Sequence, residues 1–308
     1  MNATTTTTAE PGTEIHGIRP RSHRLPDATR IGAVHLDVSD LDRSIAYYRD
    51  VLGFRVAGDV AQGAGRIATL TAHDSDTALV HLHERPGARA VPRTGRLGLY
   101  HFAILLPDRA ALGRFVAHLA ALRAPAGMSD HLVSEAIYLR DPDGLGIEVY
   151  ADRPRESWRW NAGELAMTTE PLDVENLLAA GAGASWTGMP AGTTVGHVHL
   201  HVGELPAAAA FYHDALGFDA VVWRYPGALF LSAGGYHHHL GLNTWAAGAP
   251  PAVEGDARLR EWELVVPDAD AIDRATASLE SAGHRVERDD EGARIADPWG
   301  TVLRIVSR

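Results

Sequence analysis

The chain has no cysteine among its 308 residues, so it can form neither disulfide bonds nor thiolate metal sites. Any bound metal must therefore be held by histidine, aspartate or glutamate, and 17 histidines are available. No apolar run reaches the roughly 18 residues of a membrane-spanning segment. The N-terminus also lacks the basic start and apolar middle of a signal peptide, which predicts a cytoplasmic protein.

Positive charge is also scarce, because 28 basic residues stand against 39 acidic ones and give a formal charge of -11. This balance repels nucleic acid and anionic membrane surfaces, so we expect neither as a partner. The hydrophobic content of 45% and the length are those of a globular protein of about two domains. A small neutral or weakly acidic ligand is the partner that this composition favours.

The first structured part of the chain has a β-α-β-β-β pattern. Residues 31–38 alternate between apolar and polar as a half-buried strand does. Residues 39–53 begin with capping side chains, place apolar residues at helical spacing and end at glycine, which predicts an amphipathic helix. Three further strands are expected at 54–60, 66–72 and 78–83.

This pattern is repeated along the chain. A second strand and helix are expected at 97–108 and 109–122, and residues 195–218 resemble 31–54 at an offset of 164. The sequence Asp-Pro-Asp-Gly at 141–144 is matched by Asp-Pro-Trp-Gly at 297–300. Agreement at several places in the same order indicates duplication. The sequence thus predicts an α+β fold of four βαβββ modules in two pairs.

The expected domain boundaries follow from these repeats. We expect a disordered N-terminal tail and a linker rich in glycine, alanine, threonine and proline, with a short helix near 172–180. The N-terminal domain would contain the first two modules and the metal site. The ranges are 1–29 for the tail, 30–152 for the N-terminal domain, 153–192 for the linker and 193–308 for the C-terminal domain.

Glu148 is the residue in this pattern that first indicates a cation. It follows the turn at 141–144, where proline fixes φ and glycine permits a positive φ, and it lies in an apolar stretch with strand character. A carboxylate in such a strand is costly to bury unless a positive or hydrogen-bonding group receives it. A carboxylate at this position therefore indicates that further metal ligands lie near it.

These residues resemble the vicinal oxygen chelate superfamily, which includes glyoxalase I, bleomycin-resistance proteins and type I extradiol dioxygenases. In that family two modules form one open barrel, so the resemblance implies that the four modules are paired into two open β-barrel domains. The family's metal ligands come from the first, fifth and eighth strands of the barrel. Here those positions are His35, His101 and Glu148. The resemblance implies a face of two histidines and one carboxylate, which suits Fe(II), with Mn(II) as the alternative.

A second part of the resemblance is specific to the extradiol enzymes and is closest to their two-domain catechol 2,3-dioxygenase subgroup. Their signature runs from a histidine through tyrosine and Asp-Pro-x-Gly to the glutamate ligand, and it is matched by His131, Tyr138, 141–144 and Glu148. Glyoxalase I lacks this histidine and tyrosine. The resemblance implies that His131 and Tyr138 hydrogen-bond the substrate. His81, on the fourth strand, is the expected acid–base residue, with His83 as its alternative.

The C-terminal pair of modules lacks the standard ligand set. His199 keeps the first position, but Glu261 and Arg304 replace the second histidine and the glutamate, and arginine cannot ligate a cation. His237 and His239 share one side of an extended segment. Together with His199 and Glu261 they form either a second metal or substrate site, or a hydrogen-bonded polar segment, and the sequence leaves both interpretations open.

The sequence thus predicts a metal-dependent extradiol dioxygenase that cleaves the ring of a small aromatic diol with O2. One alternative is a glyoxalase-type isomerase or lyase with Ni, Zn or Mn, which His81 would favour as a fourth ligand. The other is a non-catalytic small-molecule binding protein like the bleomycin-resistance proteins. Because the edges of such modules commonly pair, a homodimer is also expected.

Overall fold

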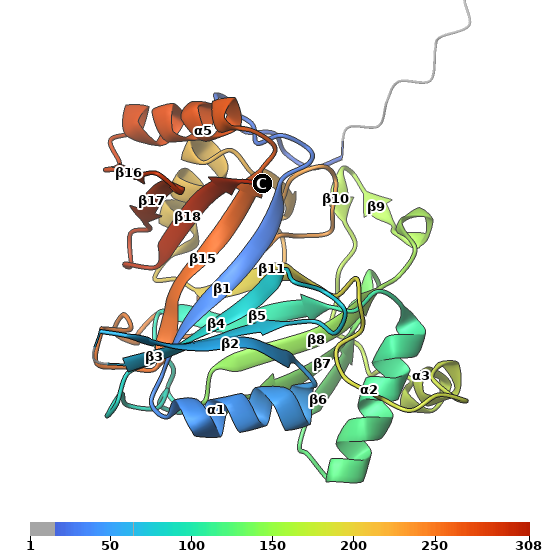
Figure 1. Cartoon of the computed structure of the whole chain (residues 1–308). Helices are drawn as coiled ribbons and strands as arrows, with labels where there is room; N and C mark the ends of the chain where they lie inside the picture. The colour runs from blue at the N-terminus through green and yellow to red at the C-terminus, as the bar shows by residue number, and fades with distance from the viewer. Residues whose placement is uncertain (1–15, 64) are drawn as a thin grey trace, which may run out of the picture.

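The computed structural model describes residues 16–63 and 65–308, which form two eight-stranded mixed sheets with helices outside them (Figure 1). The first module comprises β1 (Arg30–Val38), α1 (Leu41–Tyr47), β2 (Arg55–Gln62), β3 (Gly65–Thr71) and β4 (Ala78–Glu84). The second comprises β5 (Gly98–Leu105), α2 (Arg109–Leu122), β6 (Gly127–Asp130), β7 (Ser134–Arg140) and β8 (Gly146–Asp152).

The second half of the chain repeats this order. Its third module comprises β11 (Thr194–His201), α4 (Leu205–Ala209), β12 (Asp219–Val222), β13 (Ala228–Ser232) and β14 (Leu240–Asn243). The fourth comprises β15 (Arg258–Val266), α5 (Ala269–Ser281), β16 (Glu287–Asp289), β17 (Gly292–Ala296) and β18 (Val302–Ser307). The predicted α+β fold of four βαβββ modules is confirmed.

The helix that follows the first strand of each module begins at an acidic residue. Asp40, Asp108 and Asp268 each accept a hydrogen bond from the backbone N–H three residues on, which satisfies an otherwise unpaired donor. Glu204 takes the same place before α4. After α1 the helix continues as a π-helical turn over Tyr48–Leu52 and ends at Gly53, whose φ of 88° suits glycine.

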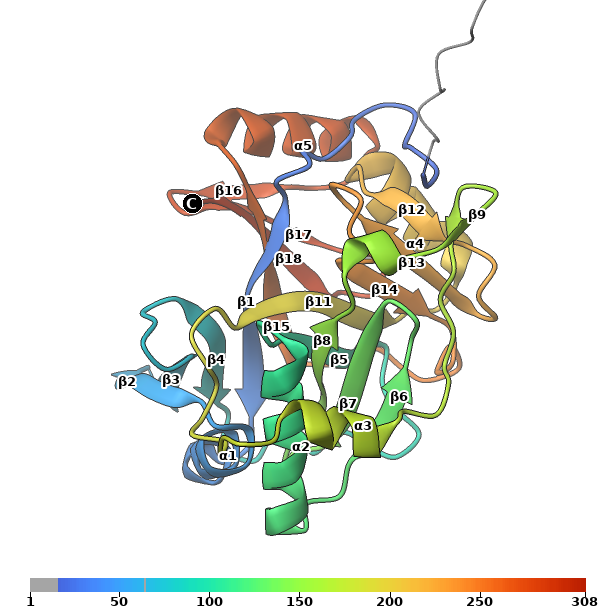
Figure 2. The same cartoon turned by 90° about the vertical axis from the view of Figure 1, so that its right-hand side faces the viewer.

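The modules pair differently from the order of the chain. β1 pairs with β15, so the first and fourth modules form one sheet, and β11 pairs with β5, so the second and third modules form the other. Figures 1 and 2 show these pairs side by side. We expected the two modules within 30–152 to form one barrel and the two within 193–308 to form the other. The observed strand pairing differs, because each sheet combines one module from each half of the chain. The repeat makes the first strands of the modules similar in sequence, so it does not determine which of these strands pair with each other.

The segments outside the modules also pack against them. Leu25 is buried, Arg24 pairs with Asp219, and Ile18 bridges to Ala220 of β12. The expected disordered tail is therefore ordered from residue 16 onward, because these contacts hold it, and residues 1–15 lie outside the described part.

The connector contains β9 (Trp160–Asn161), β10 (Glu164–Leu165) and α3 (Val174–Ala180), which matches the expected short helix. α3 lies directly on α2, where a Cβ added at Gly113 would lie 2.3 Å from the carbonyl oxygen of Leu177. Only glycine permits this approach. None of the helices in the described part of the chain combines the length and apolar character needed to cross a membrane.

Candidate metal centre

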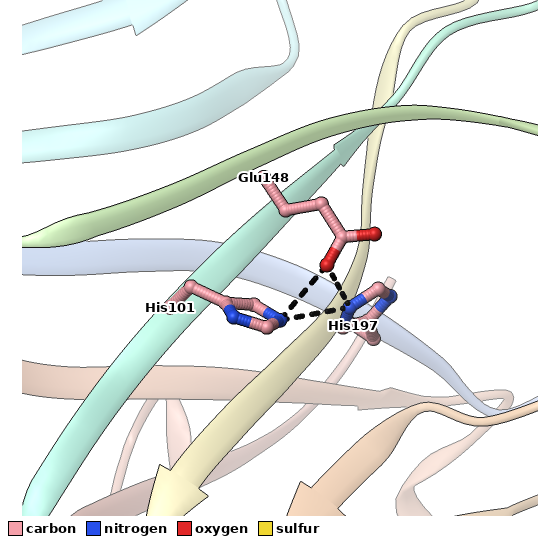
Figure 3. Close-up of side chains that lie close together, drawn as sticks. All are labelled: His101, Glu148 and His197. Atoms are coloured by element: carbon pink, nitrogen blue, oxygen red, sulfur yellow. Dashed lines mark hydrogen bonds and ion pairs between the residues drawn. The ribbon is translucent and has the colours of Figure 1, made fainter. Parts of the chain in front are cut away.

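Three buried side chains from three neighbouring strands converge on one point (Figure 3). His101 Nε2 lies 3.0 Å from Glu148 Oε2, and His197 Nε2 lies 3.3 Å from the same oxygen. The two Nε2 atoms are 3.3 Å apart. Among residues 16–63 and 65–308, this is the set of three histidine or carboxylate side chains whose ligand atoms lie within 4.8 Å of one another.

The order of the strands explains this convergence. β5 lies between β11 and β8, with Ala103 beside His197 on one side and beside Glu148 on the other. His101 is two residues before Ala103, so its side chain points to the same face of the sheet. Each residue is fixed by a strand hydrogen-bonded on both sides, which gives the site a rigid support.

The protonation states that burial and charge favour here are those that bind a cation. Burial opposes ionisation of Glu148, but the neighbouring His197 and His101 hold the pKa of the carboxyl well below its ordinary value. Burial lowers the pKa of His197 to about 4, although Glu148 opposes this shift. A carboxylate and a neutral imidazole are the ligand forms of these groups. The donor set therefore fits a divalent cation.

A cavity of about 210 Å³ opens on this cluster and has room for one small molecule. Its lining is aromatic and imidazole-rich, with a few hydroxyl groups. The lining residues are Tyr100, His101, Ser129, His131, Tyr138, Glu148, Met167, Thr168, Thr169, His197, His199, Tyr225, Phe230, His238 and Trp245.

His131 and Tyr138, expected from the sequence, line this cavity as a hydrogen-bonded pair. His131 Nδ1 lies 2.7 Å from the carbonyl oxygen of Thr168, which can only accept, so this nitrogen carries the proton. The other nitrogen, Nε2, then accepts from the Tyr138 hydroxyl at 2.7 Å. Burial raises the pKa of Tyr138 well above its ordinary value, so the hydroxyl stays protonated. The hydroxyl oxygen keeps a lone pair for a ligand proton.

His35, expected as the first ligand, lies in the other sheet. It stands on β1, between β4 and β15, where its ring stacks on His81 at a centroid distance of 4.4 Å. Its Nδ1 lies 3.1 Å from His83 Nε2. His35, His81 and His83 therefore do not reach the His101 cluster, because the first module pairs with the fourth. His81, which would have favoured the isomerase alternative as a fourth ligand, therefore lies away from this cluster.

The other suggested cluster is also separated. Glu261 lies on β15 in the other sheet and pairs with Arg294 at 2.5 Å, whereas His199 lines the cavity beside His101, Glu148 and His197. His237 Nε2 lies 2.8 Å from Asp152, and His239 Nδ1 accepts the backbone N–H of Ala233. These contacts favour the polar, hydrogen-bonded interpretation of this segment.

His197 and His238 are the site residues that the sequence analysis missed. His197 stands seven residues before the helix-capping Glu204, as His101 stands seven before Asp108. The same count from Asp40 gives Ala33 rather than His35. The seven-residue spacing from the histidine to the helix cap could therefore have identified His197. The alignment at an offset of 164 instead matched His35 with His199.

His238 lies at the inner wall of the cavity. Its ring centroid is 4.1 Å from that of His197, and burial holds its pKa well below the ordinary value. It is thus a neutral imidazole directly beside the proposed ligands.

This fold and site agree with the comparison to known families. The model of the Glyoxalase/Bleomycin resistance protein/Dioxygenase superfamily matches residues 30–149 and 194–305, and the chain belongs to this superfamily. A curated relative from Bacillus subtilis (strain 168), named Catechol-2,3-dioxygenase, is 45% identical over 278 residues. The match covers 89% of this chain and 95% of that protein.

Solved structures show the same fold at low sequence identity. A putative dioxygenase from Bacillus subtilis has a TM-score of 0.61 at 13% identity, covering 92% of this chain and 86% of its own. Glyoxalase I from Zea mays has a TM-score of 0.54 at 18% identity, covering 91% of this chain and 92% of its own. At these identities the likeness concerns the fold alone.

Proposed function

We propose that this protein is an extradiol dioxygenase that binds a small catechol-like diol and cleaves its ring with O2. The observation that carries the proposal is the convergence of His101, Glu148 and His197 at a small cavity that also presents the Tyr138 hydroxyl and the His238 ring. The curated relative's name supports the same reaction class.

Two histidines and one carboxylate suit Fe(II), which would leave adjacent coordination positions for the diol and O2. Mn(II) is the alternative that the same donor set accepts. In this proposal His197 replaces His35 as the first ligand, while His101 and Glu148 keep the roles expected from the sequence.

The protein side chains would bind, orient and deprotonate the diol. Phe230, Trp245 and Met167 supply apolar walls that pack against an aromatic ring and exclude water. Tyr138, which donates its proton to His131, would accept a hydrogen bond from one hydroxyl group of the diol.

His238 replaces His81 as the proposed acid–base residue, because its neutral ring lies beside the ligands. It would take a proton from the diol and return it later in the reaction, a role that typically contributes 10²- to 10⁴-fold in rate.

The test is O2 consumption by protein loaded anaerobically with Fe(II) and offered a panel of catechols. We expect substrate-dependent O2 uptake with a ring-cleaved product, abolished in Glu148→Ala and retained in His35→Ala. His35 is the control, since it is a strand histidine of the other sheet that does not reach the His101 cluster. Absence of O2 uptake with every catechol, in protein shown to contain iron, would overturn the proposal.

A further inference from the structure

His238 belongs to a hydrogen-bonded array that extends away from the cavity. Its Nδ1 lies 2.7 Å from Nδ1 of His237, and Nε2 of His237 lies 2.8 Å from Oδ1 of Asp152. Asp152 ends β8, the strand that carries Glu148, whereas the two histidines lie between β13 and β14. The array therefore joins the second and third modules behind the metal centre.

We infer that Asp152 and His237 are positioning residues that hold His238 in the tautomer with its proton on Nδ1, so that the Nε2 lone pair faces the cavity. The inference rests on the proposed function, since it explains how His238 would serve as the base. Neither Asp152 nor His237 lines the cavity, so both act through His238.

The proton positions follow from the hydrogen-bonding partners. A carboxylate only accepts, so the 2.8 Å contact to Asp152 requires a proton on Nε2 of His237. In a neutral ring the other nitrogen, Nδ1, then carries a lone pair and must accept. The 2.7 Å contact between the two Nδ1 atoms consequently requires His238 to donate from its Nδ1. Nε2 of His238 is then the nitrogen whose lone pair no hydrogen bond of this array uses.

The surroundings hold this array in one arrangement. His237 is fully buried, and its ring lies against those of Trp158 and Tyr236. The Tyr236 hydroxyl donates to the same oxygen of Asp152 at 3.1 Å and accepts from Tyr150 at 2.7 Å. The Tyr236 hydroxyl and Nε2–H of His237 therefore both donate to Oδ1 of Asp152, and this oxygen holds the His237 ring in place.

The array also prepares His238 to carry charge. When Nε2 takes a proton from the substrate, the imidazolium keeps its Nδ1–H donated to His237, and the negative charge of Asp152 lies at the far end of the array. A carboxylate behind a histidine acts in the same way in Ser-His-Asp enzymes, where replacing it with asparagine costs about 10⁴-fold in kcat because the wrong tautomer forms.

The decisive measurement is a long-range ¹H–¹⁵N correlation spectrum of the full chain, metal-free and labelled at histidine nitrogen. The signals of His238 are identified by their loss in His238→Gln. We expect His238 to be protonated at Nδ1 and His237 at Nε2. A proton on Nε2 of His238 in the wild-type protein would overturn the inference, whatever the activity.

Kinetics of the iron-loaded enzyme supply the second readout. His237→Leu removes the acceptor and should lower kcat about 100-fold with KM and iron content unchanged, whereas His237→Gln offers a carbonyl acceptor and should retain most of kcat. His239→Gln is the matched control, because this buried neighbour bonds to Ala233 and not to His238. Equal kcat in wild type and His237→Leu would also overturn the inference. If the expected tautomers occur in a protein without dioxygenase activity, the array is supported and only the proposed reaction fails.

Discussion

Nε2 of His101 lies 3.3 Å from Nε2 of His197, although the two residues are 96 positions apart in the chain. Two imidazole nitrogens that share a cation at about 2.1 Å are expected at roughly 3.0 to 3.4 Å from each other. The cluster thus has the spacing of a ligand set, and it exists only because β11 of the second half pairs with β5 of the first.

The first prediction concerns metal and stability. Because the ligands come from both halves, a bound metal should hold the second and third modules together and stabilise the native state by mass action. Removing it with a chelator should lower the melting temperature of the wild type by about 5 °C. Differential scanning calorimetry measures the change. In Glu148→Ala, which has lost one ligand, the chelator should make no difference, and an equal shift in both proteins would contradict the account.

A second prediction concerns the acid–base residue. His238→Gln keeps a polar side chain of similar length but cannot take a proton, so kcat should fall at least about 100-fold. Iron content should equal that of the wild type, because His238 is not among the converging ligands. The matched variant His81→Gln, at the residue first expected from the sequence, should keep wild-type kcat. The reverse order of effects would show that the other sheet carries the chemistry.

The third prediction concerns substrate orientation. Tyr138→Phe removes the hydroxyl that donates to His131 and leaves the aromatic ring in place. The loss of one hydrogen bond to the substrate, about 1 kcal/mol, should raise KM by roughly 5- to 10-fold. Steady-state O2 uptake gives both constants. Tyr47→Phe is the control, since this half-buried tyrosine lies outside the 210 Å³ cavity. An unchanged KM in Tyr138→Phe would show that the Tyr138 hydroxyl does not contact the substrate.

A fourth prediction concerns pH and the other sheet. Burial would raise the pKa of Glu263, but His35, the Ala33 amide and Arg308 together lower it to about 2 from an ordinary 4.5. The unfolded state therefore binds this proton more readily, so Glu263 stabilises the fold above about pH 4.5 and loses that effect as the pH falls toward 2.

Urea unfolding at pH 6 and pH 3 tests this sign. The free energy of unfolding of Glu263→Gln should fall less between the two values than that of the wild type. Glu280→Gln, an exposed glutamate on α5, should behave as the wild type does. Parallel losses in all three proteins would show that Glu263 makes no such contribution.

The sequence predicted the local structure well, because local signals specify it. The acidic caps and glycine ends marked the helices, and the predicted helix at 109–122 has the bounds of α2. The turn at 141–144 precedes β8, the strand that carries Glu148, and both His131, which follows β6, and Tyr138, on β7, line the cavity.

The pairing of the modules could not be predicted in the same way. β1 and β11 are copies of one strand, and either could have bonded to β5, because their hydrogen bonds form between segments far apart in the chain. For that reason the sequence analysis predicted His35 as a ligand, whereas the structure places His197 in the cluster. His238 was missed because it precedes β14 in an irregular segment, where the two-residue alternation of a strand does not determine side-chain direction.

The measurement that tests the central claim most directly is metal content, by elemental analysis, in the wild type, His197→Ala and His35→Ala. Each protein should be purified without a histidine tag. The account predicts about one equivalent of iron or manganese in the wild type and in His35→Ala, and none in His197→Ala. Metal retained by His197→Ala but lost from His35→Ala would contradict a site assembled between the two halves of the chain.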